Sequence, residues 1–134
     1  MRTQKSNQGF TLVEIMIVVA IIALLAAIAI PNLLRARMSS NDALSKATLR
    51  AISTAAESYG TSNNGNYPAN EAALTGATPP YINTAYCATS PIAGYTYSCA
   101  GMTTSGYTIT ATPVTIGSSG TTTRTITTGG VLTP

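Results

Sequence analysis

A single carboxylate, Glu14, lies inside an apolar stretch of membrane length near the start of this 134-residue chain. The stretch extends from Phe10 to Ile30, 21 residues, and only Thr11 and Glu14 within it are polar. A carboxylate at the edge of a bilayer-spanning helix is costly unless it is paired. The chemistry open to Glu14 is therefore charge pairing, and we expect its partner close to the N-terminus.

A short segment with two basic residues, Met1–Gly9, precedes the apolar run, and three interpretations of it compete. A secretory signal would be cleaved after a small residue such as Ala29, but the run exceeds the usual ~7–15 apolar residues and contains an acid. A plain single-pass anchor explains the length but gives Glu14 no role. Cleavage between Gly9 and Phe10 would instead keep the run and make Phe10 the first residue of the mature protein.

The sequence around this bond, Gly9-Phe10-Thr11-Leu12-Val13-Glu14, resembles the N-terminus of the type IV pilin family, which includes the pseudopilins of type II secretion. The resemblance extends through the apolar run and Pro31 and is close up to about Arg50. It implies the pilin fold, removal of the leader after Gly9 by a prepilin peptidase, and N-methylation of Phe10 by the same enzyme. It also assigns a role in filament assembly to Glu14, together with Phe10 and Thr11.

Processing after Gly9 would free an α-amine on Phe10 at the end of an apolar helix. Positions four apart on a helix face the same way, so Glu14 can reach the amine of its own chain. In a stack of staggered helices, Glu14 can instead meet the Phe10 amine of the next subunit. Because an unpaired charge in a packed fibre core is strongly destabilising, this pair would fix the register of the subunits. The alternative is a glutamate that only complements the helix dipole, worth under about 1 kcal/mol.

Glycine and proline divide the chain into a helical part and a part of strands and loops. Between Gly9 and Gly60 there is no glycine, and Pro31 is the only proline. We therefore predict one long helix from Phe10 to Tyr59, kinked at Pro31. The alternative is that Pro31 ends a membrane helix. The predicted segments are a removed leader (1–9), a transmembrane and assembly helix (10–30), an amphipathic helical half (31–59) and a globular head (60–134).

The amphipathic half has apolar residues at three- and four-residue steps, which predicts a face that packs against the head. This face consists of Leu44, Ala47, Ala51, Ile52, Ala55 and Tyr59, and the polar remainder of Ser40, Asp42, Lys46, Arg50, Ser53 and Glu57. Beyond it, residues 95–99 and 107–112 alternate as strands do, and 123–127 is a third strand-like stretch. A short helix is expected over 70–74, and Gly129-Gly130 would turn the last residues back. The predicted class is α+β, with the long helix packed against an antiparallel sheet of about three strands.

Cys87 and Cys99 are the only cysteines. Because the leader implies export, we expect them to form a disulfide, which would close a loop of about 13 residues and add up to ~3 kcal/mol. Free thiols are the alternative. We expect no metal site, since the chain has no histidine and two cysteines alone do not complete one.

The same composition argues against an enzyme or a nucleic-acid-binding protein. Without histidine the commonest general base is missing, and the four carboxylates form no pair. No glycine loop resembles a phosphate cradle, so no cofactor is expected. The mature chain would carry five basic side chains (seven less two in the leader) and four acidic ones, which makes no basic stripe. Arg35 and Arg37 follow the apolar run and are expected to contact lipid headgroups.

The leading interpretation is a structural subunit of a type IV pilus, held in the bacterial inner membrane by a single span and then polymerised into a surface filament. Its partners would be other copies of itself, the prepilin peptidase, the inner-membrane assembly platform and the lipid bilayer. The alternative is a type II secretion pseudopilin, which forms a periplasmic pseudopilus. Major pseudopilins resemble one another in an acid-rich calcium loop, and here no Asp or Glu follows Glu71. A membrane-anchored binding module would leave Glu14 unexplained.

Overall fold

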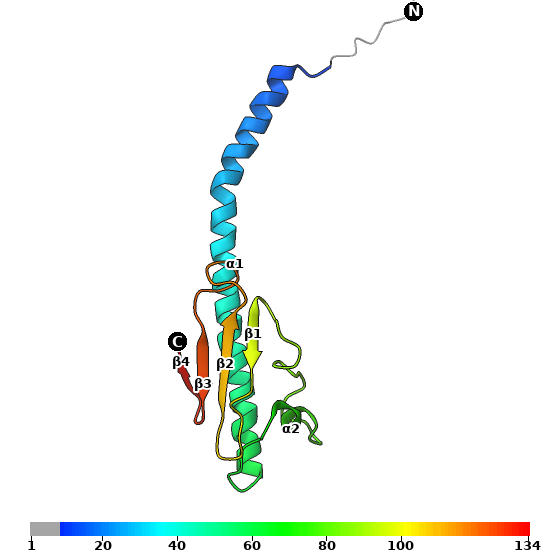
Figure 1. Ribbon diagram of the computed structural model, residues 1–134. Coiled ribbons are helices and arrows are strands. Elements are labelled where there is room, and N and C mark those ends of the chain that lie inside the picture. Colours follow the sequence, from blue (N-terminus) through cyan, green and yellow to red (C-terminus); the bar gives the residue numbers. More distant parts are fainter. Residues whose placement is uncertain (1–8) are drawn as a thin grey trace, which may run out of the picture. The chain divides into compact units, whose positions relative to one another are not determined.

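The computed structural model describes residues 9–134, so the predicted leader, apart from Gly9, lies outside the described residues. A long helix, α1 (Leu12–Ser62), is followed by a short one, α2 (Glu71–Thr75). Four strands then follow: β1 (Tyr95–Ser98), β2 (Thr108–Pro113), β3 (Arg124–Thr127) and β4 (Val131–Thr133) (Figure 1). The predicted α+β class, a long helix packed against a small antiparallel sheet, is confirmed.

Helix α1 has 51 residues and extends over 12–62, whereas the sequence predicted a helix over 10–59. It continues through Pro31, so the alternative in which this proline ends the helix is wrong. A kink at Pro31 stays a prediction. The chain forms two compact units that meet in the sequence between Arg35 and Ala36.

The sheet is an antiparallel meander with the strand order β1-β2-β3-β4. Its register places Tyr97 opposite Ala111 and Ile109 opposite Ile126, so alternate side chains of each strand share one face. The predicted turn is present at Gly129-Gly130, where both residues have positive φ values of 82° and 74°, a conformation that favours glycine. This turn returns the chain as β4, a fourth strand where about three were expected.

The hydrophobic core lies between the sheet and the C-terminal part of α1, the green part of that helix in Figure 1. Side chains from α1, α2, the strands and the loops that join them form one buried cluster. Its members are Leu49, Ile52, Ala55, Ala56, Leu74, Tyr95, Tyr97, Met102, Tyr107, Ile109, Ala111 and Ile126. Three of the twelve are tyrosines, whose hydroxyls need partners when they are buried.

The face of α1 that packs against the sheet differs from the predicted apolar face. Ile52 and Ala55 are buried as expected, but Leu44, Ala47 and Ala51 are exposed. The buried face is therefore rotated relative to the prediction, and several apolar residues of α1 point away from the core.

Small polar residues take the places in the core that the apolar pattern did not fill. Ser45, Thr48 and Ser53 are between 0% and 5% exposed. The hydroxyl of Ser53 lies 2.7 Å from that of Tyr107, and the hydroxyl of Ser45 donates to the carbonyl oxygen of Asp42 at 2.9 Å. Because Ser45 and Ser53 keep hydrogen bonds, their burial costs little. A pattern of apolar residues alone therefore does not predict that this face of α1 is buried.

Candidate functional site

The N-terminus of α1 contains the candidate assembly residues Thr11 and Glu14. The N–H and the hydroxyl of Thr11 both donate to Oε2 of Glu14, at 2.8 and 2.7 Å. The N–H of Glu14 in turn donates to the hydroxyl oxygen of Thr11 at 3.2 Å. This reciprocal arrangement is a capping box, which satisfies N–H groups that have no partner in the first helical turn.

The capping box adds a role for Glu14 that the sequence analysis missed, although Thr-x-x-Glu before an apolar run is its known signature. Both bonds from Thr11 reach Oε2, and Oε1 takes no hydrogen bond from residues 9–134. Gly9 and Phe10 precede the helix without regular secondary structure, and both are exposed. The structure thus brings Phe10, Thr11 and Glu14 together at one helix end, and it leaves one carboxylate oxygen for a further partner.

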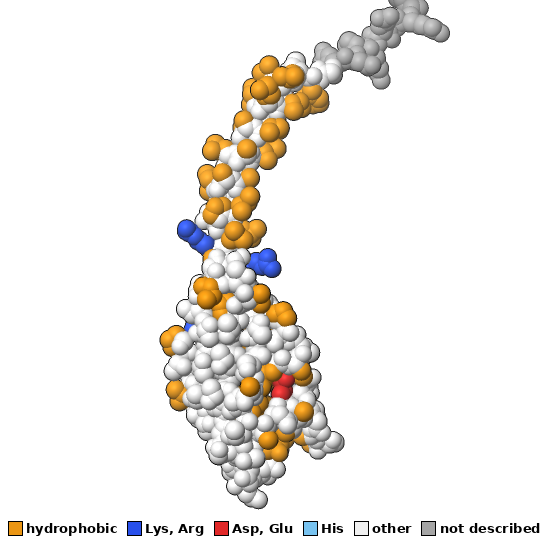
Figure 2. Space-filling model, in the orientation of Figure 1, with side chains coloured by type: hydrophobic (Ala, Val, Ile, Leu, Met, Phe, Trp, Pro, Cys, Tyr) orange, Lys and Arg blue, Asp and Glu red, His pale blue; other side chains and the backbone are white. Residues whose placement is uncertain are grey.

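Apolar side chains surround α1 beyond this end. Most of the exposed large apolar residues of the described chain lie between Phe10 and Leu34, with Phe10 itself 86% exposed. Figure 2 shows them along this part of the helix on the face in view. By its length and composition, α1 can cross a membrane. A helix that is apolar all round needs lipid or other helices around it.

Glu57, on the C-terminal part of α1, connects three other segments of the head. Its carboxylate accepts hydrogen bonds from the hydroxyls of Tyr107 (2.7 Å) and Tyr67 (2.9 Å) and from the N–H of Gly129 (2.7 Å). Burial raises the pKa of Glu57, but these three hydrogen bonds outweigh it and lower the pKa below its usual value. Burial, together with the Glu57 carboxylate, raises the pKa of Tyr107 to about 12 against an opposing hydrogen bond with Ser53.

Asp42, which is also a residue of α1, has a similar role. The hydroxyl of Tyr95 donates to Oδ1 at 2.5 Å, the N–H of Thr121 donates to Oδ1 at 3.0 Å, and the Thr121 hydroxyl donates to Oδ2. The neighbouring Asn41 donates its side-chain N–H to the carbonyl oxygen of Ser119 at 2.8 Å. Burial raises the pKa of Asp42, yet the hydrogen bonds from Thr121 and Tyr95 lower it overall. The segment between β2 and β3 is thereby fastened to α1.

Glu71 and the predicted disulfide hold one loop together. Cys87 and Cys99 are joined, with their Cα atoms 5.9 Å apart, so the expected pairing is confirmed. The Glu71 carboxylate, 7% exposed, accepts the N–H groups of Cys87 (2.9 and 3.0 Å) and Ala88 (3.1 Å). The potential ligand atoms of Glu71 and the two cysteines lie within 4.8 Å of one another. The sulfurs are bonded to each other and the carboxylate accepts hydrogen bonds from backbone N–H groups. These contacts account for the cluster as a stabilising element of the loop rather than as a set of metal ligands.

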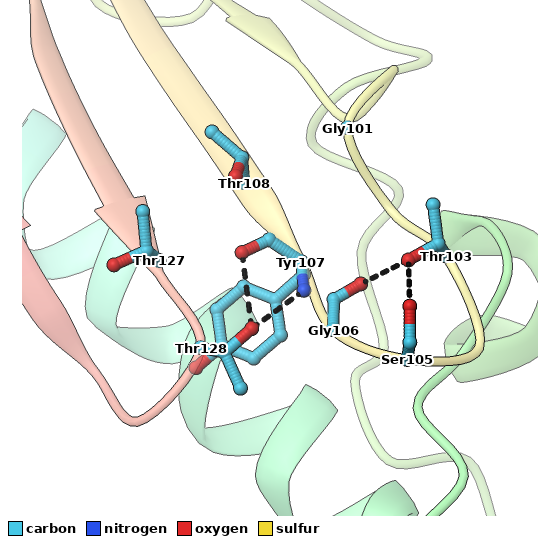
Figure 3. A pocket seen from close by; sticks show the side chains of 8 residues that line it. All are labelled: Gly101, Thr103, Ser105, Gly106, Tyr107, Thr108, Thr127 and Thr128. Carbon is cyan, nitrogen blue, oxygen red and sulfur yellow. Dashed lines mark hydrogen bonds between the residues drawn. The ribbon is translucent and has the colours of Figure 1, made fainter.

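A shallow pocket of about 380 Å³ lies beside the start of β2. Its lining is Gly101, Thr103, Ser105, Gly106, Tyr107, Thr108, Thr127 and Thr128. The hydroxyls of Thr103 and Ser105 are hydrogen-bonded to each other at 3.2 Å, and the hydroxyl oxygen of Thr128 accepts a hydrogen bond from the N–H of Tyr107 at 2.8 Å (Figure 3). The lining carries no carboxylate, amine or thiol, so the pocket contains no acid–base or nucleophilic pair.

Comparison with known proteins agrees with the N-terminal geometry. Residues 4–30 match the family described as the prokaryotic N-terminal methylation motif. The chain is 49% identical over 70 residues to the type IV wide pilus major component PilA4 of Thermus thermophilus. The aligned residues make up 52% of this chain and 53% of that protein. It is 50% identical over 58 residues to the type IV major pilin protein PilA of Myxococcus xanthus, covering 43% of this chain and 26% of PilA. A fimbrial protein of Pseudomonas aeruginosa is 54% identical over 56 residues, covering 40% of this chain and 35% of that protein.

The chain therefore spans about half the length of the first of these relatives and less of the others. A long N-terminal helix, apolar in its first part and packed on a small antiparallel sheet in its second, defines a protein with the pilin fold. The methylation motif at residues 4–30 and the similarity of the N-terminal part of the chain to these relatives support a type IV pilin.

Proposed function

We propose that this chain is the structural subunit of a type IV pilus, held in the inner membrane by the first part of α1 and polymerised through the same segment into a surface filament. The observation that carries the proposal is the pair Thr11 and Glu14, which places a carboxylate at the capped start of an exposed apolar helix. Neither a signal peptide nor a plain anchor requires this charge. We take the structure and its relatives to support a subunit that polymerises.

The proposed processing site lies between Gly9 and Phe10, ahead of the first helical residue, Leu12. A peptide bond outside regular structure is accessible to a peptidase, whereas one inside a helix is protected by its hydrogen bonds. Cleavage there would create an α-amine on Phe10, which the same peptidase would then methylate. The amine would stand four residues from Glu14, at the same end of the helix.

In the filament, we propose that Oε1 of Glu14 binds the Phe10 amine of a neighbouring subunit while Oε2 keeps its bonds to Thr11. Both charges would otherwise be buried without a partner among apolar helices. Removing one half of a buried pair costs about 3–5 kcal/mol. The pair would thus select one stagger between neighbours, because every other stagger leaves two bare charges.

The remaining proposals follow from this function. The segment 10–30 would span the membrane and later form the filament core, the segment 31–59 would connect it to the head, and residues 60–134 would face outward. An inner-membrane assembly platform would be the further partner. The type II secretion pseudopilin is disfavoured, because Asp42, Glu57 and Glu71 already hold loops of the head and are not gathered into a calcium loop.

The test is to replace Glu14 with leucine in cells that assemble filaments from this chain. We expect Glu14→Leu to be processed after Gly9 and to stay in the membrane, with the affinity between subunits reduced by an order of 10² or more and few filaments formed. Val13→Leu, an apolar change at the neighbouring position, is the matched control and should assemble normally. Sheared filaments are counted against total processed subunit, and mass spectrometry should show a methylated Phe10 as the first residue. Normal yield for Glu14→Leu would refute the register role.

A further inference from the structure

The head has one acidic side chain beyond α1, that of Glu71, and it lies beside the disulfide. One of its carboxylate oxygens and the Sγ atoms of Cys87 and Cys99 lie within 4.8 Å of one another. Glu71 is only 7% exposed, whereas both cysteines are half-buried and are followed in the sequence by the exposed Ala88 and Ala100. A negative charge is therefore held close to both sulfurs of a bond that small molecules can reach.

The backbone around Cys87 fixes the position of this charge. Glu71 is the first residue of α2, and its two oxygens accept the N–H groups of Cys87 and Ala88 at 2.9 to 3.1 Å. An ionised carboxylate is suited to such contacts because it only accepts hydrogen bonds. The one cationic side chain beyond α1, Arg124, belongs to β3, which β2 separates from β1 and from the adjoining Cys99. No cation from this sheet therefore lies next to the disulfide to offset the charge.

Reduction of the disulfide by a thiol creates further negative charge at the same place. The thiolate of the reductant attacks Sγ of one cysteine and forms a new S–S bond, while the electron pair of the old bond leaves on the other Sγ as a thiolate. A second thiol then releases the first as a small disulfide, so that two electrons pass to the protein and both cysteines become thiols. Whichever sulfur is attacked, the departing thiolate lies within 4.8 Å of a Glu71 oxygen.

We infer that the Glu71 carboxylate slows the reduction of the Cys87–Cys99 disulfide by thiols, and most strongly by anionic thiols. Two like charges about 4 Å apart repel enough to slow a step roughly fivefold even at the dielectric constant of water. The effect is on rates, because free thiols are mostly neutral at pH 7 and the carboxylate then disfavours neither end state. Reoxidation is slowed as reduction is. The inference concerns the head alone and does not depend on the proposed function.

Three small thiols that differ in charge test this role: mercaptoethanesulfonate (anionic), mercaptoethanol (neutral) and cysteamine (cationic). Glu71→Gln removes the charge while the disulfide still closes the loop. Asp42→Asn is the matched control, since it removes the same charge from a carboxylate that binds Tyr95 and Thr121 instead. The full chain is treated in a non-ionic detergent at low ionic strength. Mass spectrometry of acid-quenched samples gives the initial rate of disulfide loss per thiolate, and dividing the rate of each variant by that of the unaltered protein cancels the intrinsic reactivity of the thiol.

We expect Glu71→Gln to speed reduction by all three thiols, with a gain for the anionic thiol about fivefold larger than that for the cationic one. Asp42→Asn should change the three rates equally. An equal gain with every thiol for Glu71→Gln would show that Glu71 only supports the loop. The same dependence on thiol charge for Asp42→Asn would show that the net charge of the protein is responsible. No gain, or either of these results, overturns the inference.

The unaltered protein gives a second test, which decides if Glu71→Gln fails to fold as judged by circular dichroism. Salt screens the interaction between the thiol and the carboxylate. Added salt should therefore speed reduction by the anionic thiol and slow reduction by the cationic one. The net charge of +3 on the chain predicts the reverse, because it attracts anions. A salt dependence that follows the net charge would overturn the role of Glu71.

Discussion

Glu57 and Tyr107 are joined by a 2.7 Å hydrogen bond although they lie 50 residues apart in the sequence. The same carboxylate oxygen of Glu57 also accepts the N–H of Gly129 in the turn before β4. One side chain of α1 thus fixes both the entry to β2 and the last turn of the sheet. The charge on Glu57 belongs to the packing of the head rather than to its surface.

Replacement of this carboxylate should destabilise the head. Glu57→Gln keeps the shape but presents an amide to three donors and removes the charge, so we expect a loss of about 1.5–3 kcal/mol in the free energy of unfolding. Ser58→Ala is the matched control, because Ser58 is exposed and its hydroxyl bonds only to the carbonyl oxygen of Thr54 in its own helix. Denaturation of the full chain in detergent, followed by circular dichroism, measures the difference. Equal stability of the two variants would contradict this role.

The lowered pKa values of Asp42 and Glu57 predict a loss of stability in acid. Each carboxyl binds its proton more weakly in the folded than in the unfolded protein, so its contribution is complete above the unfolded pKa of about 4 and disappears as the pH falls through the folded value. Tyr107, with its pKa raised to about 12, stays protonated in this range and contributes nothing to the slope. Thermal unfolding between neutral and acid pH should show this decrease, and Asp42→Asn combined with Glu57→Gln should flatten it.

These two carboxylates also mark the limit of what the sequence predicted. The absence of glycine between Gly9 and Gly60 predicted the long helix, and the alternation of residues predicted the principal strands, because local sequence decides those elements. The predicted buried face of α1 was wrong. Ser53 can be buried because its hydroxyl has a hydrogen-bond partner, the hydroxyl of Tyr107, which only folding brings near. Asp42 and Glu57 were assigned to the polar side of α1 for the same reason: their donors come from loops far along the sequence. The capping box at Thr11 is different, because the spacing Thr-x-x-Glu before an apolar run is enough to predict it.

The loop at Cys87 has two independent attachments, the disulfide to Cys99 and the Glu71 carboxylate. After reduction, we expect the N–H groups of Cys87 and Ala88 to stay protected from hydrogen exchange, because Glu71 still binds both. Protection should disappear only when reduction is combined with Glu71→Gln. The amides of β2 serve as the internal reference. Loss of protection on reduction alone would show that the disulfide is the sole support of this loop, whose closure contributes up to ~3 kcal/mol.

The capping box and the proposed charge pair make opposite predictions for one substitution. A glutamine in the third position of a helix supports a capping box as a glutamate does, but it cannot neutralise an ammonium. Glu14→Gln therefore keeps the hydrogen bonds to Thr11 and removes only the charge. If the charge pair sets the subunit register, Glu14→Gln should form few filaments, close to the yield of Glu14→Leu.

Thr11 supplies the complementary test. Thr11→Val keeps the size of the side chain but removes the hydroxyl that donates to Glu14 and accepts its N–H, which should cost about 1 kcal/mol at the helix start. The carboxylate of Glu14 remains charged and keeps the N–H bond from residue 11, so filament yield should fall far less than with Glu14→Gln. Thr11→Ser restores the hydroxyl and should restore the yield. The reverse order, with normal filaments from Glu14→Gln and few from Thr11→Val, would show that Glu14 serves the helix end alone and that another contact sets the register.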